Sequence, residues 1–349
     1  MLEIYAGKTA LNTIKEQGLK PDIFTSFLGA SGGPKWFTLF GLDKYIFGEF
    51  FQGRTTPLNI IGSSAGAFRA ACFAQNDPVK AIECLAKNYS ETVYSDKATP
   101  QEITQKAHDL LDLVFANGGD EQVVNNQVMR AHFIVAKAKG LVACESKFLQ
   151  AIGLIKSMLL NRMDRRQLKG QYQRYVFQNQ FSDFEMHDSY QFDTFSQPLN
   201  KDNIHDALMA SGAIPMVMQG IKNIPHAPKG MYRDGGIIDY HFDIKIKTNG
   251  LVLYPHFSHN PKAGWFDKNL DRKVNIDNYD NIVFLCPSDA FVKSLPYGKI
   301  PDRNDFTELD ADTRIKYWKE VLVRTDELAV SFKDIIDHQK LDCIKPFTG

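Results

Sequence analysis

Short apolar runs alternate with helical periodicity along most of this chain. Residues 22–28 and 58–61 are apolar runs typical of buried strands, and a small-residue turn and a helical pattern follow each of them. The same patterns predict further strands at 172–177, 190–195, 251–254 and 281–286. Helices are predicted at 2–17, 37–46, 65–75, 100–116, 121–139, 143–163, 203–212 and 307–339, with another that begins at Pro78. Strands that alternate with helices predict an α/β fold with a mostly parallel central sheet.

One helical stretch, 149–160, is apolar on most sides and is interrupted by Lys156. This composition favours a buried core or cap helix, and an acyl-facing or interfacial lid is the alternative. No internal repeat, low-complexity segment or linker divides the chain, so a single domain over 1–349 is the simplest expectation. Within it we expect a helical cap or insert at about 77–163 and a C-terminal helical region at about 305–342.

Composition and charge exclude several classes of protein. The 41 basic and 41 acidic side chains cancel, and a chain without a basic excess is a poor candidate for nucleic-acid binding. Any contact with a membrane surface must then rest on apolar surface or on local charge clusters. The five cysteines form no C-x-x-C pair, which argues against a disulfide framework or a zinc site and favours a reducing compartment. There is no signal-peptide pattern and no run of about 18 apolar residues, so the expectation is a protein without a transmembrane segment that is cytoplasmic or peripherally associated with a membrane. We expect no cofactor.

The clearest chemical signal is Gly62-Ser63-Ser64-Ala65-Gly66, which joins the strand at 58–61 to a helix. This is the G-x-S-x-G turn, in which a serine projects its hydroxyl from a tight strand-to-helix reversal. Gly62 and Gly66 are needed because strand and helix nearly touch on either side of the serine. The free N–H groups at the start of the helix, Ala65 included, favour developing negative charge at Ser64.

A second loop, Gly29-Ala30-Ser31-Gly32-Gly33-Pro34-Lys35, follows the first strand. A nucleotide phosphate loop does not fit it, because such a loop ends in Gly-Lys-Ser/Thr, whereas Pro34 precedes Lys35 here and Trp36 follows. The dinucleotide-binding pattern G-x-G-x-x-G does not fit it either. Two interpretations stay open from the residues alone: a flexible strand-to-helix turn, or a cradle of backbone N–H groups for an oxyanion.

Three stretches, taken in order, resemble the patatin-like phospholipase family. They are the glycine loop with Lys35 in the basic position, the serine turn at Ser64, and Asp234-Gly235-Gly236. The block Ala210-Ser211-Gly212-Ala213-Ile214-Pro215 is similar to the family's small-residue segment ahead of its aspartate, so the resemblance covers about 22–238. The chain departs from the family pattern at Ser31, which replaces a glycine, and at Trp36, which also replaces one.

The resemblance implies a three-layer α/β/α sandwich and a Ser–Asp dyad that cleaves fatty-acyl esters through an acyl-enzyme. Ser64 would be the nucleophile and Asp234 its base, because a serine hydroxyl is weak until a neighbouring base takes its proton. The expected oxyanion hole comprises Ser31, Gly32, Gly33, Lys35 and Ala65. Gly62, Gly66, Gly235 and Gly236 would hold these turns in shape. We expect helices between 121 and 163 to line the acyl chain.

Several alternatives stay open. His241, His256, His259 and His338 all follow Asp234, so a Ser-Asp-His triad is compatible with the order of residues. His256-Phe257-Ser258-His259 is also a weak candidate for metal binding, although we expect a polar loop and no metal. An acyltransferase with the same acyl-enzyme, or a lipid-binding relative without catalysis, would share these motifs. The sequence does not determine the head group, the acyl length or the oligomeric state.

Overall fold

The structure is a computed structural model that describes residues 1–349. Its strands are β1 Leu2–Ala6, β2 Phe24–Gly29, β3 Leu58–Ser63, β4 Met129–Ala138, β5 Tyr172–Gln178, β6 Glu185–His187, β7 Thr194–Pro198, β8 Ile221–Lys222, β9 Met231–Asp234, β10 Lys245–Lys247, β11 Leu251–Pro255, β12 Ile282–Pro287 and β13 Ile344–Pro346. Its α-helices are α1 Lys8–Gln17, α2 Phe40–Tyr45, α3 Ala65–Phe73, α4 Pro78–Glu91, α5 Pro100–Val114, α6 Gly119–Asn125, α7 Lys147–Met163, α8 Ile204–Gly212, α9 Asp289–Ser294, α10 Asp305–Glu308, α11 Ala311–Arg324 and α12 Asp326–Asp337.

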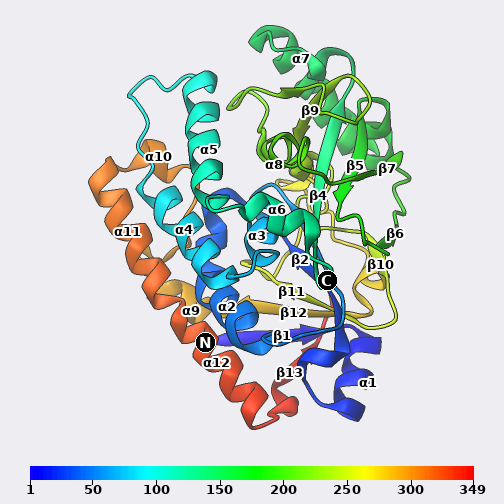
Figure 1. Cartoon of the computed structure of the whole chain (residues 1–349), viewed down its shortest axis with the longest axis vertical. Coiled ribbons are helices and arrows are strands. Elements are labelled where there is room, and N and C mark those ends of the chain that lie inside the picture. Colours follow the sequence, from blue (N-terminus) through cyan, green and yellow to red (C-terminus); the bar gives the residue numbers. More distant parts are fainter.

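A central sheet with strand order β13-β1-β12-β11-β2-β3-β4-β5-β7 organises the molecule. The five strands β12, β11, β2, β3 and β4 are parallel to one another, whereas β1 runs antiparallel to β12, and β5 and β9 run antiparallel to β4. In Figure 1 the helices α2, α4, α5, α11 and α12 lie together on one side of this sheet. The predicted α/β sandwich with a mostly parallel central sheet is confirmed.

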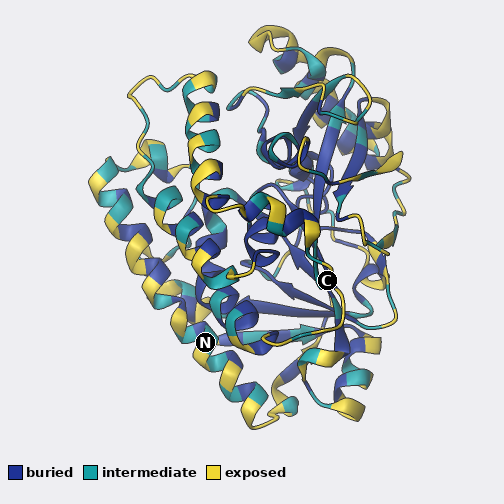
Figure 2. Cartoon of the chain, in the orientation of Figure 1, coloured by how far each residue is buried: buried dark blue, intermediate teal, exposed yellow.

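The central strands are buried along most of their length, as Figure 2 shows. All six residues of β3 are buried, so this strand reads as a continuous apolar run and not as an alternation. Parallel strands show this pattern because helices and connecting segments cover both of their faces.

The prediction of one helix over 2–17 is wrong, because the segment forms strand β1 followed by helix α1. Leu2, Ile4 and Ala6 are buried while the residues between them are half-exposed, which is the period of a strand. The strand pairs with β12 along its length, and the chain turns into α1 at Gly7.

The predicted helix over 121–139 is also wrong beyond residue 125. The short helix α6 ends at Asn125, and the ten residues of β4 then pair with β5 on one side and, on the other side, first with β3 and then with β9. The range 77–163 is therefore no purely helical insert, since it contributes a central strand to the sheet. A strand buried on both faces lacks the alternation by which a sequence reveals it.

The strand predicted at 190–195 begins only at Thr194, where β7 starts. The preceding residues form a loop around Asp188, whose carboxylate accepts hydrogen bonds from the N–H groups of Tyr190 and Phe192. The carboxylate also pairs with the buried Arg174 of β5 at 2.7 Å. A local carboxylate that satisfies backbone donors competes with strand pairing at this point.

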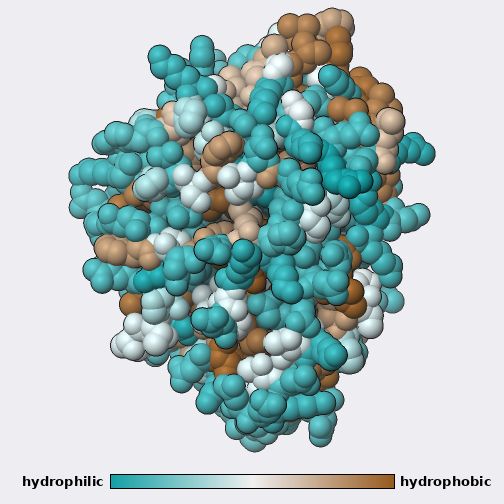
Figure 3. All heavy atoms as spheres, turned by 90° about the vertical axis from the view of Figure 1, so that its right-hand side faces the viewer, coloured by the Kyte–Doolittle hydropathy of each residue, from teal (hydrophilic) through white to brown (hydrophobic).

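Helix α7 carries its apolar side chains on the surface. Figure 3 shows a hydrophobic area at the upper end of the molecule, where α7 lies. The prediction that 149–160 is a buried core or cap helix is therefore wrong for most of its apolar side chains, which are exposed. No helix of the structure combines the length and the apolar character that a membrane crossing requires.

Candidate active site

The serine turn forms where β3 meets α3. Ser64 has φ 54° and ψ −125°, a backbone conformation that non-glycine residues seldom adopt and that is found where a structure holds a reactive group in place. Its N–H donates to Ser211 Oγ at 3.0 Å, and Ser211 Oγ donates in turn to the carbonyl of Ile134 at 2.7 Å. The strained turn is thus bonded to α8 and β4.

Gly62 and Gly66 allow strand and helix to touch at this turn. A Cβ at Gly66 would lie 1.8 Å from the carbonyl oxygen of Gly29, and one at Gly62 would lie 2.1 Å from the carbonyl oxygen of Gly66. Both neighbours are backbone atoms, so they have little freedom to move. The close approach explains the two glycines without reference to chemistry.

Asp234 lies against Ser64 because of the strand order. Ser63 pairs with Ile134 across β3 and β4, and Val135 pairs with Asp234 across β4 and β9. The strand β4 therefore brings together two residues that are 170 positions apart, and Ser64 Oγ donates to Asp234 Oδ2 at 2.8 Å. This distance is within the reach needed for proton transfer.

The carboxylate of Asp234 is held in a buried turn. Its Oδ1 accepts from the N–H of Gly236 at 2.7 Å. A Cβ at Gly235 would lie 2.1 Å from the carbonyl oxygen of Ile134, so the chain can pass β4 here only as glycine. Burial raises the pKa of Asp234 to about 6, against the opposing effect of the hydrogen bonds from Ser64 and Gly236.

A pH profile tests this pKa. If Asp234 takes the proton of Ser64, only its ionised form is active, so kcat/KM for a soluble p-nitrophenyl ester should rise with pH through an inflection near 6. Below about pH 5 each pH unit should cost roughly tenfold, since the ionised fraction falls by that factor. A profile that stays flat down to about pH 4, with the fold intact by circular dichroism, would contradict the assignment.

The glycine loop offers fewer oxyanion donors than the sequence predicts. The N–H of Ser31 donates to the carbonyl of Tyr240 at 2.9 Å, and the N–H of Lys35 donates to the carbonyl of Gly32 at 3.4 Å. The side chain of Lys35 forms an ion pair with Asp302 at 3.1 Å. The prediction that Ser31 and Lys35 contribute to the oxyanion hole is therefore wrong for their backbone N–H groups, because backbone carbonyls already accept hydrogen bonds from both.

Gly32, Gly33 and Ala65 remain as candidate donors. The N–H of Gly32 has no protein acceptor, and Gly33 and Ala65 begin helical turns, where the first N–H groups have none within the helix. Gly32 and Gly33 have φ values of 154° and 55°, which favour glycine, and the loop places both beside cavities that reach Ser64.

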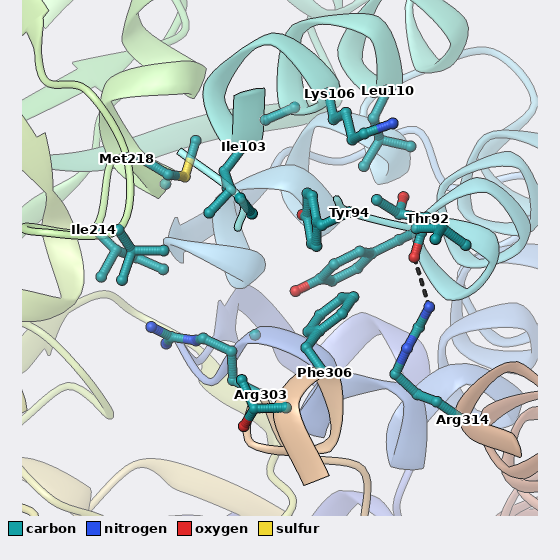
Figure 4. A pocket seen from close by; sticks show the side chains of 18 of the residues that line it. Thr92, Tyr94, Ile103, Lys106, Leu110, Ile214, Met218, Arg303, Phe306 and Arg314 are labelled. Atoms are coloured by element: carbon teal, nitrogen blue, oxygen red, sulfur yellow. Dashed lines mark hydrogen bonds between the residues drawn. The ribbon is translucent and has the colours of Figure 1, made fainter. Parts of the chain in front are cut away.

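A cavity of about 1030 Å³ opens from Ser64. Apolar side chains make up most of its lining, among them Ile103, Leu110, Ile214 and Met218 in Figure 4. Its walls come from Trp36, from α4, α5 and the loop between them, from the segment after α8 and from residues 303–314. The expectation that helices between 121 and 163 line the acyl chain is wrong, since no residue of that range lines this cavity.

Two cations that the sequence prediction missed, Lys268 and Arg303, lie beside Ser64 and Asp234. Both line a second cavity of about 20 Å³ together with Ser64, Asp234 and Gly32, and neither has an ion-pair partner. Arg303 also lines the large cavity, where Figure 4 shows its side chain pointing away from Arg314. Burial lowers the pKa of Lys268 to about 8. The positive charge of Lys268 and Arg303 favours an anion beside Ser64. Neither residue belongs to a local motif, so the sequence did not reveal their position.

The late histidines take no part in the hydrogen bonds of the Ser64 and Asp234 side chains. His241 Nδ1 accepts from the N–H of Lys262, and His256 is hydrogen-bonded to the backbone of Ser258. Burial lowers the pKa of both imidazoles, that of His256 to about 3. His259 bonds to Glu3, and His338 bonds to Asp334 of its own helical turn. None of the four is hydrogen-bonded to Ser64 or Asp234.

Alanine variants of these four histidines separate a dyad from a triad. We expect each folded variant to keep kcat/KM on a soluble ester within about tenfold of wild type, because no imidazole bonds to the reacting groups. Removal of a triad histidine costs about 10⁴-fold or more. One histidine variant with such a loss and an unchanged circular dichroism spectrum would establish the triad.

Comparison with known proteins defines the class. A family model described as "Patatin-like phospholipase" matches residues 49–241, more than half of the chain, and this range includes both Ser64 and Asp234. The chain belongs to the patatin-like phospholipase family, a family of lipid acyl hydrolases. The resemblance found in the sequence is confirmed.

A search of curated proteins gave no match. Among solved structures, the chain is similar to VipD from Legionella pneumophila at 12% sequence identity and a TM-score of 0.38. That similarity covers 88% of this chain and 67% of the VipD chain.

Proposed function

We propose that this chain is a serine hydrolase of fatty-acyl lipid esters that works through a Ser64–Asp234 dyad. The observation that carries the proposal is the 2.8 Å hydrogen bond from Ser64 Oγ to the buried Asp234 carboxylate, inside a family of lipid acyl hydrolases. A raised pKa supports the role of Asp234, because a carboxylate with an ordinary pKa is a weak base near neutral pH.

In the first step Ser64 Oγ attacks the ester carbonyl while its proton passes to Asp234. The N–H groups of Gly32, Gly33 and Ala65 stabilise the oxyanion, and a single such donor contributes about 3 kcal/mol to catalysis in other acyl-transfer enzymes. Collapse of the tetrahedral intermediate expels the alcohol, which takes the proton from Asp234, and leaves the acyl group on Ser64.

In the second step water replaces the alcohol. Asp234 takes a proton from the water as the water attacks the acyl-enzyme, and the proton returns to Ser64 as the fatty acid departs. Lys268 and Arg303 support this chemistry by their charge, since both oxyanions form beside them. The large apolar cavity is suited to the acyl chain of the substrate.

Labelling with a fluorophosphonate probe tests the function directly. An activated Ser64 should react covalently with the probe, and mass spectrometry of the digested protein should find the adduct on the peptide that contains Ser64. The Ser64→Ala variant should show none. Ser63, the neighbouring serine, serves as a matched control in Ser63→Ala, because its hydroxyl bonds to Ser31 and not to Asp234.

The outcome also separates the alternatives. A non-catalytic lipid-binding relative would leave Ser64 unlabelled in the folded wild-type protein, and this result would refute the proposal. An acyltransferase would be labelled too, so products are then analysed with a lipid alcohol present. Transfer of the acyl chain to that alcohol in preference to water would replace hydrolysis as the function.

A further inference from the structure

Helix α7 is amphipathic, but its apolar face points to the solvent and its polar face points to the protein. Its large apolar side chains recur at three- and four-residue intervals on the solvent side, with Phe148 74% exposed, Ile155 54%, Leu159 54% and Met163 76%. Ile152 and Met158 extend the same surface, which we call the α7 apolar face. A helix on a protein that only meets water shows the opposite pattern, and a contiguous exposed apolar surface marks a contact with another apolar phase.

The buried side of α7 is polar, and hydrogen bonds fix it. Ser157 Oγ lies 3.1 Å from the hydroxyl of Tyr172, and Asn161 Nδ2 donates to Asp267 Oδ1 at 2.8 Å. Gly153 lets the helix approach Val142 so closely that a Cβ would lie 2.8 Å from its backbone nitrogen. These contacts hold the helix in one rotation, so the α7 apolar face cannot turn inward without leaving its polar groups unpaired.

The segment 139–169, which contains α7, carries mostly positive charges, although the whole chain is neutral. The only acids of residues 139–169, Glu145 and Asp164, are paired with arginines. Five cations of the same segment have no ion-pair partner, and they are Lys139, Lys147, Lys156, Arg162 and Lys169. A rim of free cations around an apolar helix face complements anionic lipid head groups above an acyl layer.

The α7 apolar face is connected to the site of the proposed reaction. Gln150 Oε1 of α7 accepts from the N–H of Met216 at 2.8 Å, and Met216 lies between Ile214 and Met218, which line the large cavity. Just before α7, Glu145 pairs with Arg233, the residue that precedes Asp234. In Figure 1 α7 and the loop between α4 and α5, which lines the cavity, lie toward the same end of the molecule.

We propose that α7 is a docking helix that lies in the surface of an anionic lipid layer, with its apolar face among the acyl chains. The cations at its rim bind the head groups and hold the catalytic cavity against the layer from which the lipid enters. The link to lipid entry rests on the proposed function, whereas docking itself requires no catalysis.

Flotation with vesicles tests docking, with the full-length Ser64→Ala variant so that no lipid is consumed. This protein should float with vesicles of phosphatidylcholine and phosphatidylglycerol. The double substitution Ile155→Gln and Leu159→Gln should weaken the binding at least about tenfold, because it removes two exposed side chains from the acyl layer. Val323→Gln with Val330→Gln is the matched control, since these exposed valines of α11 and α12 lie outside the face.

The charges are tested separately. Replacing Lys147, Lys156 and Arg162 by glutamine should weaken binding to the mixed vesicles roughly a hundredfold, because each cation near an anionic surface contributes about a fivefold factor. Binding to pure phosphatidylcholine should be weak in every variant and unaffected by these three changes. Equal binding of the Ser64→Ala protein to neutral and anionic vesicles would overturn the role given to the cations.

Two further results would overturn the proposal. Wild-type protein that stays with the soluble fraction would exclude lipid docking. Sedimentation velocity that shows a dimer of the wild type, lost in the Ile155→Gln and Leu159→Gln variant, would assign the face to a second copy of the chain.

Activity separates this inference from the proposed function. On a water-soluble ester the active α7 variants should match wild type, while on vesicle lipid their rate should fall in proportion to binding. If the protein did not bind vesicles but Ser64 were fully labelled by the fluorophosphonate probe, the docking proposal would be refuted and the proposed hydrolase function would stand. If the protein bound vesicles but Ser64 were not labelled, the hydrolase function would be refuted and the docking proposal would stand.

Discussion

The Asp234→Asn variant is expected to lose about 10³- to 10⁴-fold in kcat/KM on a soluble p-nitrophenyl ester, with its fold unchanged. Asparagine keeps the shape of the side chain and an oxygen that can accept from the N–H of Gly236. It lacks the carboxylate that takes the proton of Ser64 Oγ in the proposed mechanism and that accepts a hydrogen bond from this hydroxyl at 2.8 Å. The expected loss is therefore in the chemical step and not in stability.

Initial rates and thermal unfolding of the purified variant provide the measurement. Asp271→Asn is a suitable control, because Asp271 is exposed and lies outside the site's cavities, so its rate should equal that of wild type. Turnover by Asp234→Asn at the wild-type rate would mean that another group activates Ser64. The dyad would then be wrong even though the two side chains are hydrogen-bonded.

The Gly66→Ala variant is expected to lose about 3 kcal/mol or more of its free energy of unfolding, or to fail to fold. The added Cβ would lie 1.8 Å from the carbonyl oxygen of Gly29, a separation far inside any van der Waals contact. The atoms that this Cβ would meet are backbone atoms of Gly29 and Ala30, which cannot move aside alone, so α3 would have to move away from β2. This shift would also displace Ser64, so catalysis should fail together with stability.

Urea denaturation followed by circular dichroism measures this effect. Gly170→Ala is the control, because a Cβ there meets no atom within 4 Å, and the stability should change by less than about 0.5 kcal/mol. An unchanged midpoint for Gly66→Ala would show that strand and helix are not in the contact described. The reason given for the glycines of the serine turn would then fail as well.

Features that depend on nearby residues were predictable from the sequence. The turn at Ser64 was predicted because its chemistry is local: an apolar strand, two glycines that permit the close approach, and a helix immediately after. The sequence also suggested the partner Asp234, although only through the resemblance of its Asp-Gly-Gly segment to a known family. An aspartate before two glycines is by itself an ordinary turn.

Features that depend on distant residues were not predictable. Strand β4 was mistaken for a helix because a strand buried on both faces has no alternation. The N–H of Ser31 was expected in the oxyanion hole, and only the fold shows that the carbonyl of Tyr240, 209 positions away (240 − 31), already takes it. Lys268 and Arg303 belong to no motif and meet beside Asp234 through loops that the sequence leaves undefined.

The sequence by itself thus determined the class of fold, the strand-to-helix turn at Ser64 and the glycines around it, because backbone sterics and short-range periodicity fix these features within a few residues. Only the tertiary structure decided which N–H groups remain free, which walls enclose the cavity and which face of α7 meets the solvent. Each of these depends on which long-range partner satisfies a polar group or covers an apolar one. Strand order and packing set that pairing, and the composition of a segment does not reveal it.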